Sequence, residues 1–348
     1  MSVLMSIIIT ILILGLLIFV HELGHFLVAK KVGIRVQEFA LGMGPVVFAK
    51  QTEETLYSLR AFPVGGFNRM AGMEGGETTD PRGFNTRTVG QRMGVIAAGS
   101  LMNFVLAIFL FIVFFMGIGV ESNSNRIAGV VKGGVAEQAG LMAGDQILAI
   151  NGIETSTWND LTNIIRGKPE HDLDILVLRG SRQFELTLRS TLDATENVGM
   201  IGIKRSFERK GFFESIWLGI SSSVALGVFI IQQLGMMLGG LIPADVAGPV
   251  GMVQIVGDVM EFGIGTIIKF AAMLSLNLGI INLFPIPALD GSRLVFLGIE
   301  GLRGKPIKPE RENFFHFVGF VLLIGLMLLI TYKDIWRIFK ISIYVFYS

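Results

Sequence analysis

The sequence contains no cysteine and few charged residues. Of its 348 residues, 16% are Asp, Glu, Lys or Arg, whereas 51% are hydrophobic. The lack of cysteine excludes disulfides and thiolate metal ligands, so a zinc site would have to use His and carboxylate side chains. The formal net charge of +1 is not typical of a nucleic-acid-binding protein, and we expect no nucleic-acid partner. A chain this apolar is typical of a protein with several membrane spans.

Basic residues are missing from the start of the chain, where no Lys or Arg precedes Lys30. A signal peptide would have a charged first segment and a small-residue cleavage site, and this run has neither. Residues 1–31 are therefore predicted to form a first transmembrane helix. Lys30 and Lys31 follow the apolar run directly, which predicts a cytoplasmic location for that end.

The first apolar run contains the pattern His-Glu-Leu-Gly-His at residues 21–25. On a helix, His21 and His25 share one face and can bind one zinc ion. Glu22 lies beside them and can take a proton from a metal-bound water as general base. The pattern also arises by chance, but ionisable groups in an apolar helix are costly and usually functional. The alternative is a histidine pair that reaches into the lipid headgroups.

A second unusual segment, NLFPIPALDG, occupies residues 282–291. Pro285 and Pro287 must break or kink a helix, and broken backbone at membrane depth requires a protein or water lining. Asp290 follows this break. Together with the histidine pair, it is predicted to be the third zinc ligand, with water as the fourth. The alternative is an interfacial aspartate beside Arg293.

Residues 122–190 are rich in glycine, charge and alternating apolar positions, which predicts a soluble module. The expected elements are a strand at 126–131, a short helix at 135–141, a strand at 146–150, a helix at 158–166 and a β-hairpin at 173–179 and 183–189.

The other segments predict membrane helices and cytoplasmic strands. We expect strands at 34–40, 45–51 and 54–61, and a turn or edge loop at 63–67. In the second span, Asn103 is expected to hydrogen-bond to a neighbouring helix rather than to act in catalysis. Residues 212–242 could span the membrane or lie at its interface. His316 is expected to be a helix-start or packing residue.

The zinc hypothesis constrains the topology. The basic loop at 299–312 is predicted to be cytoplasmic, and the second span carries the soluble module outside. Asp290 then reaches the side of His21 and His25 only if 212–242 does not cross the membrane. The hypothesis therefore predicts four spans.

These features together resemble the site-2 protease family of intramembrane zinc metalloproteases. The motifs that carry the resemblance are HELGH at 21–25, PVGGF at 63–67, AGSLMN at 98–103, GPVG at 248–251 and NLFPIPALDG at 282–291. The AGL and GDxIxxING patterns at 139–152 resemble a PDZ domain. The chain departs from the family at Ser100, where Pro is common, and at Ser292-Arg293, where Gly-His is common.

The resemblance implies roles for particular residues. It assigns His21, His25 and Asp290 as zinc ligands, Glu22 as catalytic base, and Asn282 as a contact to the substrate backbone or the tetrahedral intermediate. Substrate-presenting residues would be Gly65, Gly66 and Phe67, in a membrane-associated strand region. A PDZ domain binds an extended chain or a C-terminus by strand addition, here in a loop formed by Ile127, Ala128, Gly129 and Val130. Alternatively, this module only restricts access.

The predicted fold class is a polytopic α-helical membrane protein of about four transmembrane helices. It carries a cytoplasmic membrane-associated β-region and one inserted extracytoplasmic PDZ domain. The predicted divisions are helix 1 at 1–31, the β-region at 32–92, helix 2 at 93–120, the PDZ domain at 121–205, an amphipathic, interfacial or re-entrant segment at 206–262, helix 3 at 263–298, a cytoplasmic loop at 299–312, helix 4 at 313–332 and a tail at 333–348.

The predicted function is intramembrane proteolysis with one zinc ion per chain, in a bacterial inner membrane with the active site near the cytoplasmic side. Family resemblance implies single-pass membrane proteins as substrates, such as anti-sigma factors or signal-peptide remnants. Two alternatives remain at this point: a transporter whose ionisable groups form an ion path, and an inactive PDZ scaffold. The sequence does not predict the oligomeric state.

Overall fold

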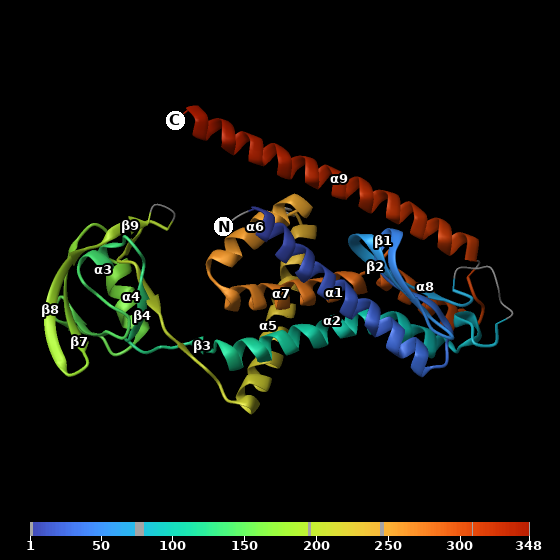
Figure 1. The fold of residues 1–348 in the computed structure, drawn as a ribbon, viewed down its shortest axis with the longest axis horizontal. Coiled ribbons are helices and arrows are strands. Elements are labelled where there is room, and N and C mark those ends of the chain that lie inside the picture. The colour runs from blue at the N-terminus through green and yellow to red at the C-terminus, as the bar shows by residue number, and fades with distance from the viewer. Residues whose placement is uncertain (1–2, 74–79, 194–195, 244–246, 308, 348) are drawn as a thin grey trace. The chain divides into compact units, whose positions relative to one another are not determined.

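The computed structural model describes residues 3–73, 80–193, 196–243, 247–307 and 309–347. The chain divides into two compact units, which are described separately. One is a helical unit formed by Met1–Phe114 together with Ile216–Ser348. The other is formed by Phe115–Ser215 and is rich in strands (Figure 1).

Long apolar helices dominate the helical unit. In the part of the chain that the structure describes, five helices are long and apolar enough to cross a membrane. About four spans were expected, and the additional helix, α5, occupies the segment that sequence analysis left open. The helices are α1 (Val3–Lys31), α2 (Val89–Gly117), α5 (Phe212–Leu238), α6 (Pro249–Glu261), α7 (Ile264–Leu283), α8 (Asp290–Arg303) and α9 (Pro309–Tyr347), with a 3-10 turn at Phe84–Thr86.

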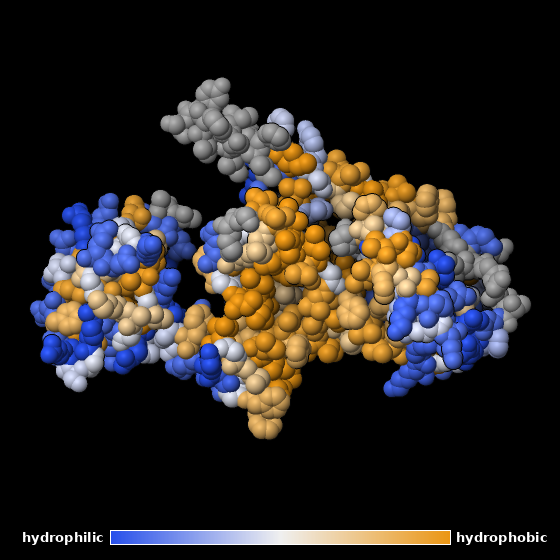
Figure 2. Space-filling model, viewed as in Figure 1, coloured by the Kyte–Doolittle hydropathy of each residue, from blue (hydrophilic) through white to orange (hydrophobic). Residues whose placement is uncertain are grey.

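The surface of the helical unit is apolar over its middle, as Figure 2 shows by the broad orange region. Large hydrophobic side chains on several helices are exposed, among them Leu12 of α1, Phe109 of α2 and Phe320 of α9. A contiguous apolar surface of this extent is not stable in water. Its presence supports a multi-pass membrane protein.

Glycines allow close contacts between the helices. A Cβ on Gly24 of α1 would overlap the carbonyl oxygen of Ala98 in α2, and one on Gly219 of α5 would lie 2.8 Å from the side chain of Ile112 in α2. Gly257 of α6 faces Ser6 near the start of α1. Figure 1 shows α5 running crosswise to α2 and α7 rather than alongside them.

The region after Asp290 corrects the prediction of a loop at 299–312. Residues 290–303 form α8, which ends at Gly304 in a left-handed conformation (φ 66°). The next helix, α9, begins at Pro309 and continues through the expected tail to Tyr347. The basic residues that indicated a loop include Arg303 in the last turn of α8, where a cation favours the helix dipole.

Two long strands replace the three predicted short ones. They are β1 (Val36–Gln51) and β2 (Leu56–Met70). Residues 63–67, expected to form a turn or edge loop, lie within β2. Phe39 pairs with both Tyr57 and Asn68, so the first part of β1 lies between two segments of β2. Among the described residues, β1 is the only strand paired with Gly66–Met70, and this segment is therefore a sheet edge.

Glu38 fastens the bent sheet internally. Its buried carboxylate accepts hydrogen bonds from Ser58 at 2.7 Å and Arg60 at 2.6 Å. Burial opposes ionisation, but these two hydrogen bonds and the charge of Arg60 outweigh it and hold the pKa of Glu38 below its ordinary value. The ionised carboxylate therefore ties β1 to the first half of β2.

In the second unit, the helix predicted at 158–166 is confirmed, and the hairpin predicted at 173–179 and 183–189 is confirmed with each strand beginning one residue earlier. A four-stranded sheet has the order β6-β5-β7-β8 and packs on α4 through a core that includes Ile147, Leu161 and Ile175. Its elements are β3 (Val120–Glu121), β4 (Ile127–Val130), α3 (Val135–Gln138), β5 (Gln146–Ile150), β6 (Ile153–Glu154), α4 (Trp158–Arg166), β7 (Asp172–Arg179), β8 (Arg182–Arg189), β9 (Thr191–Asp193), β10 (Val198–Met200), β11 (Ile203–Arg205) and β12 (Phe207–Glu208).

Candidate metal centre

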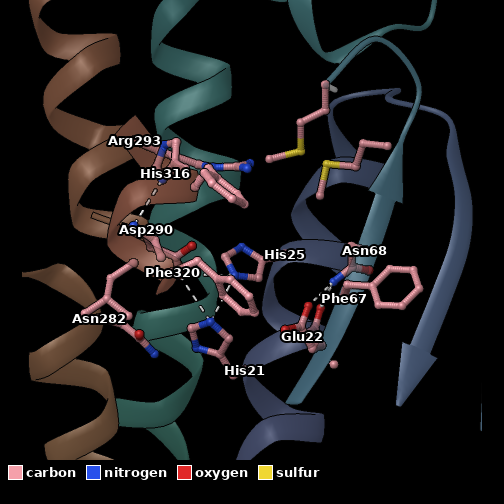
Figure 3. Close-up of a pocket in the computed structure, with 16 residues that line it drawn as sticks. His21, Glu22, His25, Phe67, Asn68, Asn282, Asp290, Arg293, His316 and Phe320 are labelled. Atoms are coloured by element: carbon pink, nitrogen blue, oxygen red, sulfur yellow. Dashed lines mark hydrogen bonds and ion pairs between the residues drawn. The ribbon is translucent and has the colours of Figure 1, made fainter. Parts of the chain in front are cut away.

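A cavity of about 530 Å³ lies in the helical unit, where α1, β2, the α7–α8 connection and α9 meet. It brings together residues that are up to about 300 positions apart in the chain (Figure 3). Its lining residues are His21, Glu22, His25, Gly66, Phe67, Asn68, Met70, Met73, Asn282, Ala288, Leu289, Asp290, Arg293, His316, Phe317 and Phe320.

Three potential metal ligands converge on one point of this cavity. Nε2 of His21 lies 3.1 Å from Nε2 of His25, and Oδ2 of Asp290 lies 3.2 and 3.3 Å from these two nitrogens. Ligands about 2.0–2.1 Å from a tetrahedral zinc ion are about 3.3 Å from one another. Oδ2 of Asp290 is buried without a hydrogen-bond partner. The spacing and the donor set therefore fit zinc, with one coordination position left.

Local structure explains how Asp290 reaches the histidines. After α7 ends, Ala288 adopts a left-handed conformation (φ 72°), which turns the chain into α8 at Asp290. The far end of α8 is fixed by Glu300, which forms a two-point ion pair with Arg92 of α2 at 2.5 and 3.0 Å. Both of these side chains are largely buried. This pair holds α8 against α2.

Gly99 of α2 provides the space for both imidazole rings. A Cβ at this position would overlap Nε2 of His25 and lie 2.7 Å from Cε1 of His21. The histidines therefore pack directly on the backbone of α2. In the same region, Nδ1 of His25 lies 2.8 Å from the carbonyl oxygen of Val95. A protonated Nδ1 can donate to this carbonyl, which leaves Nε2 free to bind a metal.

Glu22 lies in the cavity, and its side chain is hydrogen-bonded to a residue of the β-sheet rather than to the three potential ligands. The Nδ2 group of Asn68, on β2, donates to Oε2 of Glu22 at 2.7 Å and to its backbone oxygen at 2.9 Å. Figure 3 shows these two residues facing the three converging ligands across the cavity. Sequence analysis did not single out Asn68. The sequence signal that could have identified Asn68 is its position directly after PVGGF, in a predicted strand region where asparagine is unfavourable.

Other predicted residues differ in their positions. Asn282, Gly66 and Phe67 line the cavity, whereas Gly65 is not among its lining residues. His316, expected only to start or pack a helix, accepts a hydrogen bond at Nδ1 from the backbone N–H of Ala288 at 3.2 Å. It thus connects α9 to the turn before Asp290.

The predicted peptide-binding loop at Ile127, Ala128, Gly129 and Val130 needs correction. These residues form β4, which is paired with β11 on one side. On the other side, Ile127 exchanges backbone hydrogen bonds with residues 144 and 145 at 2.9 and 2.8 Å. These residues therefore form a strand rather than the predicted loop, and the backbone groups of Ile127 are already paired on the side away from β11.

The sequence also matches a family model, "Peptidase family M50", over residues 9–326. The chain belongs to peptidase family M50. It is therefore a zinc metalloprotease of the site-2 protease type, and this membership favours the enzyme reading over the transporter and scaffold readings.

Curated relatives match over nearly the whole chain. The regulator of sigma-W protease RasP of Bacillus subtilis is 33% identical, over 94% of this chain and 98% of the relative. A putative zinc metalloprotease of Fusobacterium nucleatum is 36% identical, over 97% and 100%. Among solved structures, a PDZ domain of an SdrC-like protein from Listeria monocytogenes is 21% identical with a TM-score of 0.22, over 25% of this chain and 90% of that chain.

Proposed function

We propose that this protein is an intramembrane zinc endopeptidase that cleaves a peptide bond within the transmembrane segment of single-pass membrane proteins. The carrying observation is the convergence of His21, His25 and Asp290 in a cavity whose wall includes a sheet edge, Gly66–Met70, to which no described strand other than β1 is paired. One face of this cavity suits a metal and another suits an extended peptide.

The cavity residues divide the chemical work. His21, His25 and Asp290 would hold a zinc ion, which would supply Lewis-acid chemistry by polarising the scissile carbonyl and lowering the pKa of a water molecule to about 7. Glu22 takes the proton from the attacking water and returns it to the leaving nitrogen. Asn68 orients the Glu22 carboxylate, and Asn282 hydrogen-bonds the substrate backbone or the tetrahedral intermediate.

A substrate helix must unwind before its peptide bonds become accessible, because its backbone groups are hydrogen-bonded to one another. The Gly66–Met70 edge offers replacement partners through strand addition. Gly66 packs closely on Glu22, since a Cβ there would lie 2.9 Å from Cγ of that residue. A peptide on this edge would therefore run past the base and the metal ligands.

We further propose that α1, α2, α7 and α9 cross the inner membrane and that α5 does not. Because Asp290 meets His21, α7 ends on the side of the membrane where α1 ends, whereas α2 ends on the other side. The chain between α2 and α7 must then return to the side it left. The 13-residue α6, at about 20 Å, is too short to cross, so α5 stays on that side. The unit formed by Phe115–Ser215, proposed to be a PDZ domain, follows α2 directly and would therefore be extracytoplasmic.

The test is cleavage of a panel of tagged single-pass proteins by detergent-purified enzyme, with the cut site located by mass spectrometry. Wild-type protein should cut at least one panel member within its transmembrane segment. Glu22→Gln should lower the rate at least about 100-fold, because general-base catalysis contributes that much. It should keep about one zinc per chain, because Gln replaces a residue that is not a ligand.

The matched control is Glu53→Gln, an equal change at an exposed position between β1 and β2 outside the cavity, which should keep cleavage within the membrane segment. An active Glu22→Gln enzyme would refute the base assignment. Cleavage confined to the tags, or none by the wild type across the panel, would overturn the proposed function.

A further inference from the structure

We propose that Asn103 is a positioning residue for the metal site, whose amide oxygen accepts a hydrogen bond from Nδ1–H of His21 and so fixes the ring that presents Nε2 to zinc. This inference rests on the proposed role of His21 as a ligand. From the sequence alone, Asn103 was expected only to hydrogen-bond to a neighbouring helix.

The geometry directs Asn103 at the ring nitrogen that faces away from the metal. The side-chain amide of Asn103 lies 3.3 Å from Nδ1 of His21, whose Nε2 points at His25 and Asp290. Asn103 is fully buried. Its backbone oxygen accepts a hydrogen bond from Ser275 of α7 at 2.8 Å, which fixes this turn of α2.

Zinc binding at Nε2 of His21 determines which hydrogen-bond partner Nδ1 of the same ring requires. A neutral imidazole that binds zinc through Nε2 carries its proton on Nδ1, and that N–H requires an acceptor. In the structure Nδ2 of Asn103 faces Nδ1, and Oδ1 is buried without a hydrogen-bond partner. A half turn of the amide, which hardly changes its shape, directs Oδ1 at Nδ1 and supplies the acceptor.

The two histidines are then held in the same way from the same helix. His25 is 2.8 Å from the backbone carbonyl of Val95, and His21 has the side chain of Asn103 two turns later on α2. The backbone carbonyl of Asn103 already accepts a hydrogen bond from Ser275. The side chain of Asn103 is therefore the acceptor that this residue offers to His21.

The test measures zinc affinity by competition with a chromogenic chelator in the purified full-length chain. Asn103→Leu keeps the size and loses the acceptor, so zinc should bind about 10- to 100-fold more weakly. Asn103→Asp keeps an acceptor oxygen and should bind within about threefold of the wild type or more tightly. Ser100→Ala, a buried change on the same helix at a hydroxyl without a partner, should leave affinity unchanged.

Unchanged affinity in Asn103→Leu, or equal weakening in the Leu and Asp variants, would overturn the inference. Should the Leu variant not fold, the nitrogen-15 spectrum of zinc-loaded wild-type protein decides: a protonated Nδ1 on His21 supports it, and an unprotonated one refutes it. His21→Ala separates the two proposals. Full zinc binding in that variant would instead refute His21 as a ligand and, with it, the proposed site.

Discussion

At the scale of single residues, the position of the Glu22 carboxylate depends on one donor atom, Nδ2 of Asn68. Asn68 donates from one amide nitrogen to both the carboxylate and the backbone oxygen of Glu22. These two hydrogen bonds restrict the rotamer of Glu22, the proposed base. A base that is misplaced by about 1 Å can lose about 100-fold in rate, so Asn68 should affect turnover more than binding.

We expect Asn68→Leu to lower kcat by about 10- to 100-fold, because the carboxylate of Glu22 loses its orienting donor. KM and zinc content should stay near wild type, since neither the sheet edge nor the ligands change. Steady-state kinetics on a cleaved panel substrate, with zinc measured by mass spectrometry, checks this. Gln51→Leu at the end of β1 is the control, because the Gln51 side chain lies outside the cavity and donates a hydrogen bond to the backbone oxygen of the adjacent Thr52. An equal fall in both variants would indicate a general effect on the sheet.

At the scale of elements, the α1–α2 crossing shapes the site. Gly24 lets the two helices approach at one point, and Gly99 lets the imidazoles rest on α2. In most helices glycine costs stability, by about 1 kcal/mol relative to alanine. At Gly24 and Gly99, however, a Cβ would overlap atoms of the neighbouring helix or of the imidazole rings, so alanine should cost more through this overlap than it gains in helix propensity.

Gly99→Ala should weaken zinc binding at least about 10-fold, because its Cβ must displace imidazole atoms that have a required geometry. The same change at Gly94, one turn earlier on α2 with open space around it, is the matched control and should keep wild-type affinity. Chelator competition measures the affinity, and circular dichroism should show undiminished helix in both. Wild-type affinity in Gly99→Ala would contradict the packing argument.

At the scale of the whole molecule, the proposed topology follows from the meeting of Asp290 with the two histidines. The contact of Asp290 with His21 and His25 supports α5 lying on the side where α2 ends. Because the chain has no cysteine, single introduced cysteines report sidedness without background.

Leu241→Cys, just after α5, should react with a membrane-impermeant maleimide added outside intact cells. Asp172→Cys, in the unit formed by Phe115–Ser215, should react in the same way. Lys305→Cys, after α8, should react only after the membrane is opened. Labelling of Leu241→Cys only in opened membranes would mean that α5 crosses, and the four-span topology would have to be abandoned.

The sequence alone determined several local elements of the fold. Local patterns predicted the helix of His21 and His25, the break at Pro285 and Pro287, and the helix at 158–166, because periodicity and proline geometry act within a few residues. The same local signals were misleading where long-range contacts prevail. Basic residues beyond Asp290 suggested a loop, although residues 290–303 form a helix. The stretch at 63–67 suggested a turn, but pairing with β1 makes it part of a strand.

The sequence predicted that Asp290 would join the histidines, but only the tertiary structure decided which other distant groups meet. It brings Asn68 to Glu22, Asn103 to His21 and His316 to Ala288. It also makes Ile127 part of a strand, where a peptide-binding loop had been predicted. These contacts join residues that are not neighbours in the chain, and their formation depends on packing between elements, which has no signature in a local stretch of sequence.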